Sequence, residues 1–185
     1  MKKSLCVFCG SSQGTDKIFC EQASALGKHL ATSNIKLIYG GASIGCMGAI
    51  ANGCLRAGGE VEGIIPEHIS DLEVAHDGLD VLHVTDNMHQ RKDKMYCMSD
   101  AFLALSGGFG TLDELCEVVT WKQLGLHNKP IFLVNTNGFY DHFLEHIKSV
   151  SKLGFMKPIH LEYVEVVSCA DEAIERLNQY FSPRS

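Results

Sequence analysis

The stretch AFLALSGGFGTLDE, residues 101–114, decides the fold class of this chain. Residues 101–105 are apolar and have the length of a buried β-strand, and a glycine-rich turn follows them. The residues after the turn lead into a helical pattern that ends near residue 124. A strand, a glycine turn and a helix in this order are typical of the units from which parallel sheets are built.

The same alternation extends along the whole chain on both sides of this stretch. Strands are predicted over residues 5–9, 36–39, 61–65, 81–84, 101–105, 131–134 and 163–167, and helices over, for example, 19–30, 47–57, 113–124 and 140–150. Strands that alternate with helices imply right-handed crossovers and a buried parallel sheet. We therefore expect an α/β fold in which residues 1–185 form a single Rossmann-like domain, with a mostly parallel sheet and helices on both faces.

Three glycine-rich turns follow predicted strands, at Cys9 to Ser12, Tyr39 to Gly45 and Ser106 to Thr111. Ligands bind at the carboxyl ends of the strands in such sheets, and glycine allows backbone N–H groups to approach an anion closely. The turns thus predict a cradle for phosphate and ribose, although any one of them is equally explained by the needs of a tight turn. Neither a complete dinucleotide fingerprint nor a P-loop is present, which disfavours dinucleotide or ATP chemistry.

Two charged side chains occupy unusual positions beside these turns. Glu114 completes the pattern Thr111-Leu112-Asp113-Glu114, which predicts a capping box at a helix start but also places a carboxylate next to the ligand cradle. Arg91 and Lys92 fall early in another predicted helix, where cations are disfavoured unless an anion binds there. A solvated helix face is an alternative explanation for these two cations, but the three glycine turns beside them favour an anion site. A carboxylate and a cation beside a phosphate cradle suit hydrolysis of a nucleotide N-glycosidic bond, because the ribose develops positive charge as the base departs.

Composition narrows the choice of partners. The formal net charge is −6 and the pI is near 5.8, whereas proteins that bind nucleic-acid polymers normally present a basic face. The first ten residues are too short and polar for a signal peptide or a membrane span, so we expect a cytoplasmic protein without a membrane partner. The eight cysteines are typical of reduced thiols in a core. Cys6 and Cys9 are expected on opposite faces of one strand, which argues against a metal site.

The motif SGGFGTLDE at residues 106–114 resembles the PGGxGTxxE motif of the LOG (lonely guy) family of cytokinin riboside 5′-monophosphate phosphoribohydrolases. Further similarities are CGSS at 9–12, YGG at 39–41, GCMG at 45–48, MHQRK at 88–92, TWKQLG at 120–125 and HNKP at 127–130. The resemblance implies an enzyme without a cofactor that is commonly a homodimer, with its cleft near the subunit contact. It implies a catalytic pair, Arg91 and Glu114, and a set of substrate-binding residues: Ser11, Ser12, Gly40, Gly41, Glu73, Met88, Arg91, Lys92, Gly107, Gly108, Phe109, Gly110, Thr111 and Thr120.

The chain departs from the family pattern at three positions. Ser106 stands where the family has proline, and Asp113 stands where glutamate is common. Ala42 replaces the third glycine of the usual triple, which would narrow the loop if that position required a positive φ angle.

Three other functions are compatible with parts of the sequence. The family is often labelled as possible lysine decarboxylases, which would require a Schiff-base lysine, but no lysine here stands in such a context. The segment His142-Phe143-Leu144-Glu145-His146 spells the H-x-x-E-H zinc motif, yet its histidines are expected on the polar side of a helix, so no metal is expected. A non-catalytic nucleotide- or cofactor-binding protein on the same fold is the main alternative, and the pair Arg91 and Glu114 favours the enzyme.

Overall fold

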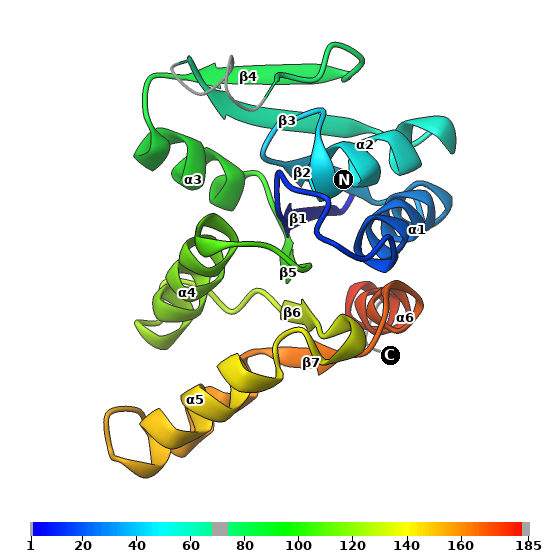
Figure 1. Ribbon diagram of the computed structural model, residues 1–185. Coiled ribbons are helices and arrows are strands. Elements are labelled where there is room, and N and C mark those ends of the chain that lie inside the picture. The colour runs from blue at the N-terminus through cyan, green and yellow to red at the C-terminus, as the bar shows by residue number, and fades with distance from the viewer. Residues whose placement is uncertain (1, 68–73, 183–185) are drawn as a thin grey trace.

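A single parallel sheet forms the centre of the protein, seen in a computed structural model that describes residues 2–67 and 74–182 (Figure 1). The strand order is β4-β3-β2-β1-β5-β6-β7, and every neighbouring pair is parallel. The strands are β1 (Ser4–Phe8), β2 (Lys36–Tyr39), β3 (Val61–Pro66), β4 (Val81–Thr85), β5 (Ala101–Ala104), β6 (Ile131–Val134) and β7 (Glu165–Val167). The predicted α/β fold is confirmed.

Helices cover both faces of this sheet (Figure 1). One face packs against α1 (Ile18–Thr32), α2 (Gly45–Arg56) and α6 (Ala170–Phe181). The other packs against α3 (Met88–Cys97), α4 (Phe109–Gln123) and α5 (Asp141–Lys152), and the short 3₁₀ helices η2 (Thr136–Gly138) and η3 (Pro158–Tyr163) flank α5. No helix in the described ranges combines the length and the apolar character needed to cross a membrane.

Strand β1 shows why the predicted strands are short apolar runs. Leu5 and Val7 pack toward α1 and α2, while Cys6 and Phe8 pack toward α3 and α4. Alternate residues of a strand point to opposite faces, and both faces are covered here, so the four positions from Leu5 to Phe8 are all apolar. Cys9, just after the strand, belongs to the α1 side, which confirms that Cys6 and Cys9 face opposite cores.

The strand order reverses beside β1 and thereby creates the place for a ligand. The chain builds outward from β1 through β2, β3 and β4, then returns to place β5 on the other side of β1. The loops that leave β1 and β5 therefore diverge to opposite faces and open a crevice between them. Two of the three glycine turns lie there.

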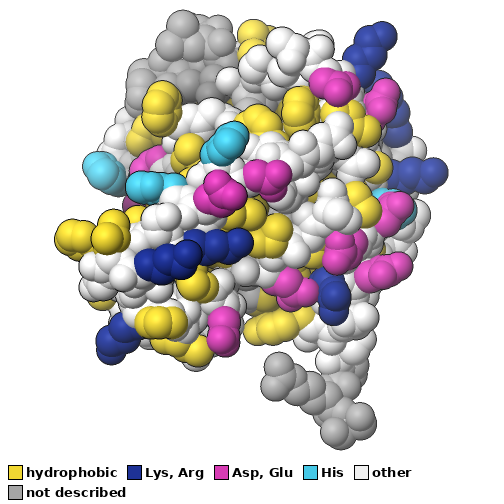
Figure 2. All heavy atoms as spheres, turned by 60° about the horizontal axis from the view of Figure 1, so that its bottom comes forward, with side chains coloured by type: hydrophobic (Ala, Val, Ile, Leu, Met, Phe, Trp, Pro, Cys, Tyr) yellow, Lys and Arg dark blue, Asp and Glu magenta, His cyan; other side chains and the backbone are white. Residues whose placement is uncertain are grey.

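The surface shows no gathering of positive charge on the face seen in Figure 2, where acidic and basic side chains are interspersed among apolar ones. Such a face offers no extended basic surface to a polyanion.

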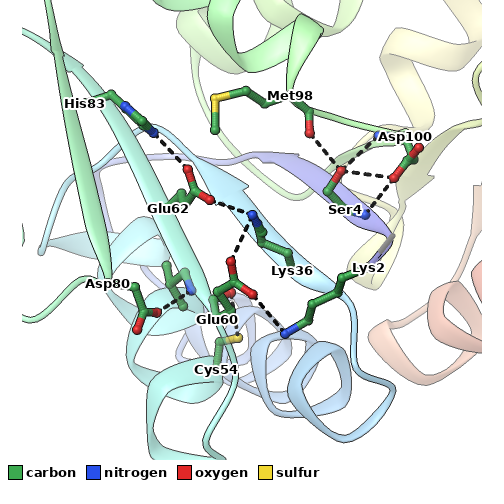
Figure 3. Close-up of polar contacts among 11 residues, drawn as sticks. Lys2, Ser4, Lys36, Cys54, Glu60, Glu62, Asp80, His83, Met98 and Asp100 are labelled. Carbon is green, nitrogen blue, oxygen red and sulfur yellow. Dashed lines mark hydrogen bonds and ion pairs between the residues drawn. The ribbon is translucent and has the colours of Figure 1, made fainter.

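A chain of ion pairs ties β2, β3 and β4 together at the amino ends of the strands (Figure 3). Nζ of Lys36 lies 2.6 Å from Glu62 and 2.9 Å from Glu60, and Nε2 of His83 lies 2.8 Å from the other oxygen of Glu62. Burial opposes ionisation of Glu62, but the contacts with Lys36 and His83 outweigh it, so the pKa of Glu62 is lowered from its usual value near 4.5. This network lies away from the crevice and stabilises the fold rather than a ligand.

Replacing Glu62 by glutamine should destabilise the protein by about 1–3 kcal/mol at neutral pH, because Lys36 and His83 lose a charged hydrogen-bond partner. A carboxylate with a lowered pKa stabilises the fold above its unfolded-state pKa and loses this effect as the pH falls through the folded-state value. Urea unfolding between pH 3 and pH 7 should therefore show a shallower loss of stability below about pH 4.5 in Glu62→Gln than in the wild type.

The matched control is Glu165→Gln, which removes an exposed pair with Arg176 and should cost about 0–1 kcal/mol. Equal effects of the two substitutions would contradict a stabilising role for the Glu62 network.

Candidate active site

A cleft of about 310 Å³ opens at the carboxyl ends of β1, β2 and β5, between α3 and α4. It brings together predicted site residues from four separate segments: Ser11, Gly40, Met88, Arg91, Gly108, Phe109, Gly110, Thr111 and Glu114. Five further residues line the cleft and were not among the predicted site residues, namely Val7, Cys9, Gly10, Met47 and Asp113. Of these, Cys9, Gly10, Met47 and Asp113 lie within family-like motifs, so the motif boundaries could have indicated them.

Helix α4 begins at the cleft without a side-chain cap. Gly108 is its N-cap residue, Phe109 is its first helical residue, and its first turn carries no acidic residue. The first N–H groups of a helix have no partner within the helix, so those of α4 are left for a ligand. The start of α3 differs, because the side chain of Asn87 accepts a hydrogen bond from the backbone N–H of Gln90.

The predicted capping box at Thr111 is wrong. The helix starts two residues earlier, and Thr111 is buried inside its first turn. A Cβ atom at Gly107 would overlap the Thr111 side chain and lie 2.9 Å from the backbone nitrogen of Gly10. The glycine therefore lets the turn close over Thr111 and start the helix early, and it frees Glu114 from a capping role.

The guanidinium group of Arg91 is fixed by main-chain oxygens at the ends of two strands. Its Nε donates to the carbonyl of Ile64 at 3.1 Å, and its Nη2 donates to the carbonyl of Gly40 at 3.1 Å. Only 5% of the residue is exposed. A buried cation needs such partners, because desolvation without them is costly. Arg91 therefore presents a fixed positive charge at the wall of the cleft.

Gly40 leaves the space that this guanidinium occupies. A Cβ atom at Gly40 would overlap Nη2 of Arg91 and lie 2.8 Å from Sδ of Met47. The glycine turn after β2 thus serves the position of Arg91 as well as the turn itself.

Glu114 lies in the second turn of α4, lines the cleft, and is 9% exposed. Glu114 and Arg91 act in opposite directions on the buried thiol of Cys6 in β1. Burial raises the pKa of this thiol, the Glu114 carboxylate raises it further, and Arg91 lowers it. Arg91 on α3 and Glu114 on α4 both line this cleft. The cleft holds a carboxylate and a fixed cation beside free helix N–H groups.

Other predicted residues lie outside this cleft. Ser12 and Gly107 line an adjoining hollow of about 280 Å³ that shares Gly10, Ser11 and Gly108 with it. Gly41 has a φ angle of +85° and lies against Ile65 and Leu82, and its carbonyl accepts from the backbone N–H of His76. The substrate-binding role predicted for Glu73 lies outside the described residues.

Lys92 and Thr120 are also absent from the lining of the cleft. Lys92 forms ion pairs with Asp113 and Glu117. Thr120 is exposed on α4, and its hydroxyl donates to the carbonyl of Cys116 at 2.7 Å.

The alanine at position 42 is compatible with the loop. Ala42 is fully buried, does not adopt a positive φ angle, and forms a bridge to Ala75. Since position 42 does not have a positive φ angle, the condition under which alanine would narrow the loop is not met.

The H-x-x-E-H segment lies on α5 with both histidines exposed, while Phe143 and Ile147 are partly buried. The described residues contain no group of three or more histidine, cysteine or acidic side chains placed to hold a metal ion.

Comparison with known proteins identifies the family of this chain. A family model described as "Possible lysine decarboxylase" matches residues 47–177. The chain is 45% identical over 170 residues to a cytokinin riboside 5′-monophosphate phosphoribohydrolase from Rhodococcoides fascians, covering 91% of this chain and 85% of that protein. It is 42% identical over 178 residues to the enzyme of the same name, LOG3, from Arabidopsis thaliana, covering 96% and 83%. The chain belongs to the LOG family.

Solved structures place this LOG-family chain on a widely used fold. The molybdenum cofactor carrier protein of Chlamydomonas reinhardtii is similar with a TM-score of 0.72 and 25% identity, covering 97% of this chain and 98% of that one. The molybdenum cofactor binding protein of Rippkaea orientalis has a TM-score of 0.76 and 22% identity, covering 98% and 99%, which shows a common fold alone.

Replacing Gly40 by alanine should displace the Arg91 guanidinium while leaving the sheet intact. We expect a crystal structure to show Nη2 moved away from the Gly40 carbonyl. A misplacement of about 1 Å at a reacting centre commonly costs about 100-fold in rate, and we expect a loss of that order in base release from AMP.

Gly78→Ala is the matched control, because its added Cβ would meet only the side chain of His76, at 3.2 Å. An unmoved Arg91 in Gly40→Ala, or an equal loss in both variants, would contradict the role assigned to Gly40.

Proposed function

We propose that the protein hydrolyses the bond between base and ribose of a nucleoside 5′-monophosphate, either AMP or a cytokinin riboside 5′-monophosphate. The products are the free base and ribose 5-phosphate. The observation that carries this proposal is the placement of Glu114 and Arg91, both buried, in one cleft with the uncapped start of α4. Relatives at 42% and 45% identity carry the name of this activity.

In the proposed mechanism, the first turn of α4 binds the 5′-phosphate through its free N–H groups, which the helix dipole assists. The C1′–N bond then breaks, and the electron pair leaves with the base, which takes up a proton. Glu114 stabilises the positive charge that develops on the ribose and orients the water whose oxygen bonds to C1′. This water loses one proton as the bond forms, which balances the proton that the base takes up. Arg91 supplies a fixed positive charge that polarises either the phosphate or the leaving base.

The cleft does not suit the decarboxylase chemistry that the family description suggests. That chemistry needs a lysine amine that forms a Schiff base with the cofactor. Among the described residues, no lysine lines the cleft, and the nearby Lys92 is engaged by two carboxylates.

Base release measured by chromatography tests the proposal. The wild type should release adenine from AMP or isopentenyladenine from isopentenyl-AMP, and the rate ratio identifies the preferred substrate. In Glu114→Gln the turnover should fall about 100- to 10,000-fold, because the carboxylate charge acts in the transition state. Binding of AMP, measured by calorimetry, should persist in this variant, since the phosphate site is unchanged.

A wild-type protein that binds AMP and releases no base over hours would contradict the enzyme. That outcome would favour a non-catalytic carrier on the same fold.

We also propose that the protein is a homodimer that buries the outer surface of α4 and α5. Large apolar side chains are exposed there, including Leu124 (66%) at the end of α4 and Phe155 (84%) after α5. Helix α5 has no fully buried residue, and Figure 1 shows it extending past the rest of the fold. Exposed apolar surface of this kind is typical of a subunit contact. Thr120, also on the outer side of α4, would then lie at the contact rather than in solvent.

Light scattering should give twice the chain mass of 20.3 kDa. The substitution Leu124→Glu should shift the mass toward one chain, because it places a charge in an apolar contact. The similarly exposed Val84 on β4 offers the matched control, Val84→Glu. A monomeric wild type, or dissociation by both substitutions, would contradict this interface.

A further inference from the structure

Lys92 connects the two helices that carry the proposed catalytic pair. It follows Arg91 on α3, and its Nζ lies 3.2 Å from Oδ2 of Asp113 and 3.0 Å from Oε1 of Glu117. Both carboxylates belong to α4, one residue before and three residues after Glu114. Lys92, the neighbour of Arg91, thus binds carboxylates on both sides of Glu114 in the sequence of α4.

The environment of Lys92 favours a fixed charge over a mobile one. Only 13% of its side chain is exposed. It faces a small cavity behind Glu114, lined also by Phe8, Tyr96, Phe102, Glu117, Val118 and Trp121. Burial alone would lower the pKa of Lys92, but the contacts with Glu117 and Asp113 raise it above its usual value. The amine therefore stays charged and engaged behind the cleft.

The two helices need such a connection because different strands support them. Helix α3 packs on β3 and β4, whereas α4 packs on β5 and β1, the two strands between which the strand order reverses. Figure 1 shows both helices side by side on one face of the sheet. The rings of Tyr96 and Trp121 meet edge to face at 4.8 Å, one turn further along each helix from Lys92 and Glu117. Lys92 is the contact nearer the cleft.

We propose that Lys92 is a positioning residue, which sets the separation of Arg91 and Glu114 through its ion pairs with Asp113 and Glu117. This role rests on the proposed hydrolysis, and it differs from the substrate contact predicted from the sequence. A substrate contact would add to phosphate affinity. A positioning residue changes the rate of the chemical step while ground-state binding is retained.

Steady-state kinetics on AMP, with ribose 5-phosphate as a competitive inhibitor, separate the two roles. In Lys92→Met we expect kcat to fall about 10- to 100-fold, since small misplacements of reacting groups are costly. KM for AMP and the inhibition constant of ribose 5-phosphate should change less than about threefold, because the phosphate site at α4 remains. Lys92→Arg keeps the charge and can reach both carboxylates, so it should recover most of kcat.

A double-mutant cycle tests the route through α4. In the Asp113→Asn, Glu117→Gln background, Lys92→Met should lower kcat by less than about threefold, because its partners are already absent. Lys94→Met on the same helix is the matched control and should retain kcat; Lys94 has no ion pair within the described part of the chain.

The outcomes are distinguishable. An inhibition constant for ribose 5-phosphate that rises tenfold or more in Lys92→Met would overturn the proposal in favour of a phosphate contact. An unchanged kcat with a lowered melting temperature would overturn it in favour of a purely structural ion pair. A wild type that releases no base would overturn the proposed hydrolysis itself, and this role with it.

Discussion

The burial of the Arg91 guanidinium against two main-chain carbonyls is the constraint on which the site depends. A cation that is 95% removed from solvent is stable only where oxygens are already fixed, and the carboxyl ends of β2 and β3 provide them. The position of this guanidinium also restricts the sequence, because a Cβ atom at position 40 would overlap it. The two hydrogen bonds of Arg91 also hold α3 against the sheet at the cleft.

The opposite wall follows from a different physical rule. Helix α4 begins on glycines, so its first N–H groups are not capped by a side chain and its positive dipole end faces the cleft. The protein carries a net negative charge, yet this local arrangement attracts an anion. Glu114 lies one turn further into the same helix, where a carboxylate and a bound phosphate can occupy the cleft together.

Much of this could be predicted from the sequence, because the signals were local. The mainly apolar runs predicted at 36–39 and 131–134 coincide with β2 and β6, since strands covered on both faces are rich in apolar residues. Arg91 and Glu114 were selected as a cation and a carboxylate at strand ends, and both line the cleft. The early start of α4 was missed, because Thr111 satisfies the capping pattern and only the close approach of Gly107 to its side chain excludes it.

The ion pairs of Lys92 could not be predicted from the sequence, because they depend on how α3 and α4 pack together. A lysine beside an arginine near the start of a helix indicates a nearby anion, and the glycine turns suggested that this anion is the phosphate of a ligand. The partners are instead Asp113 and Glu117, which lie more than twenty residues away and come into reach only when α3 and α4 pack on neighbouring parts of the sheet. Ion pairs across such separations leave no periodic signal in a single sequence.

A crystal structure of Glu114→Gln with AMP would show directly whether the start of α4 binds the phosphate while residue 114 and Arg91 flank the ribose. We expect phosphate oxygens within hydrogen-bonding distance of the backbone N–H groups in the first turn of α4, and C1′ between residue 114 and the Arg91 guanidinium. A phosphate bound at Nζ of Lys92, or a ribose held outside the reach of residue 114, would contradict this placement.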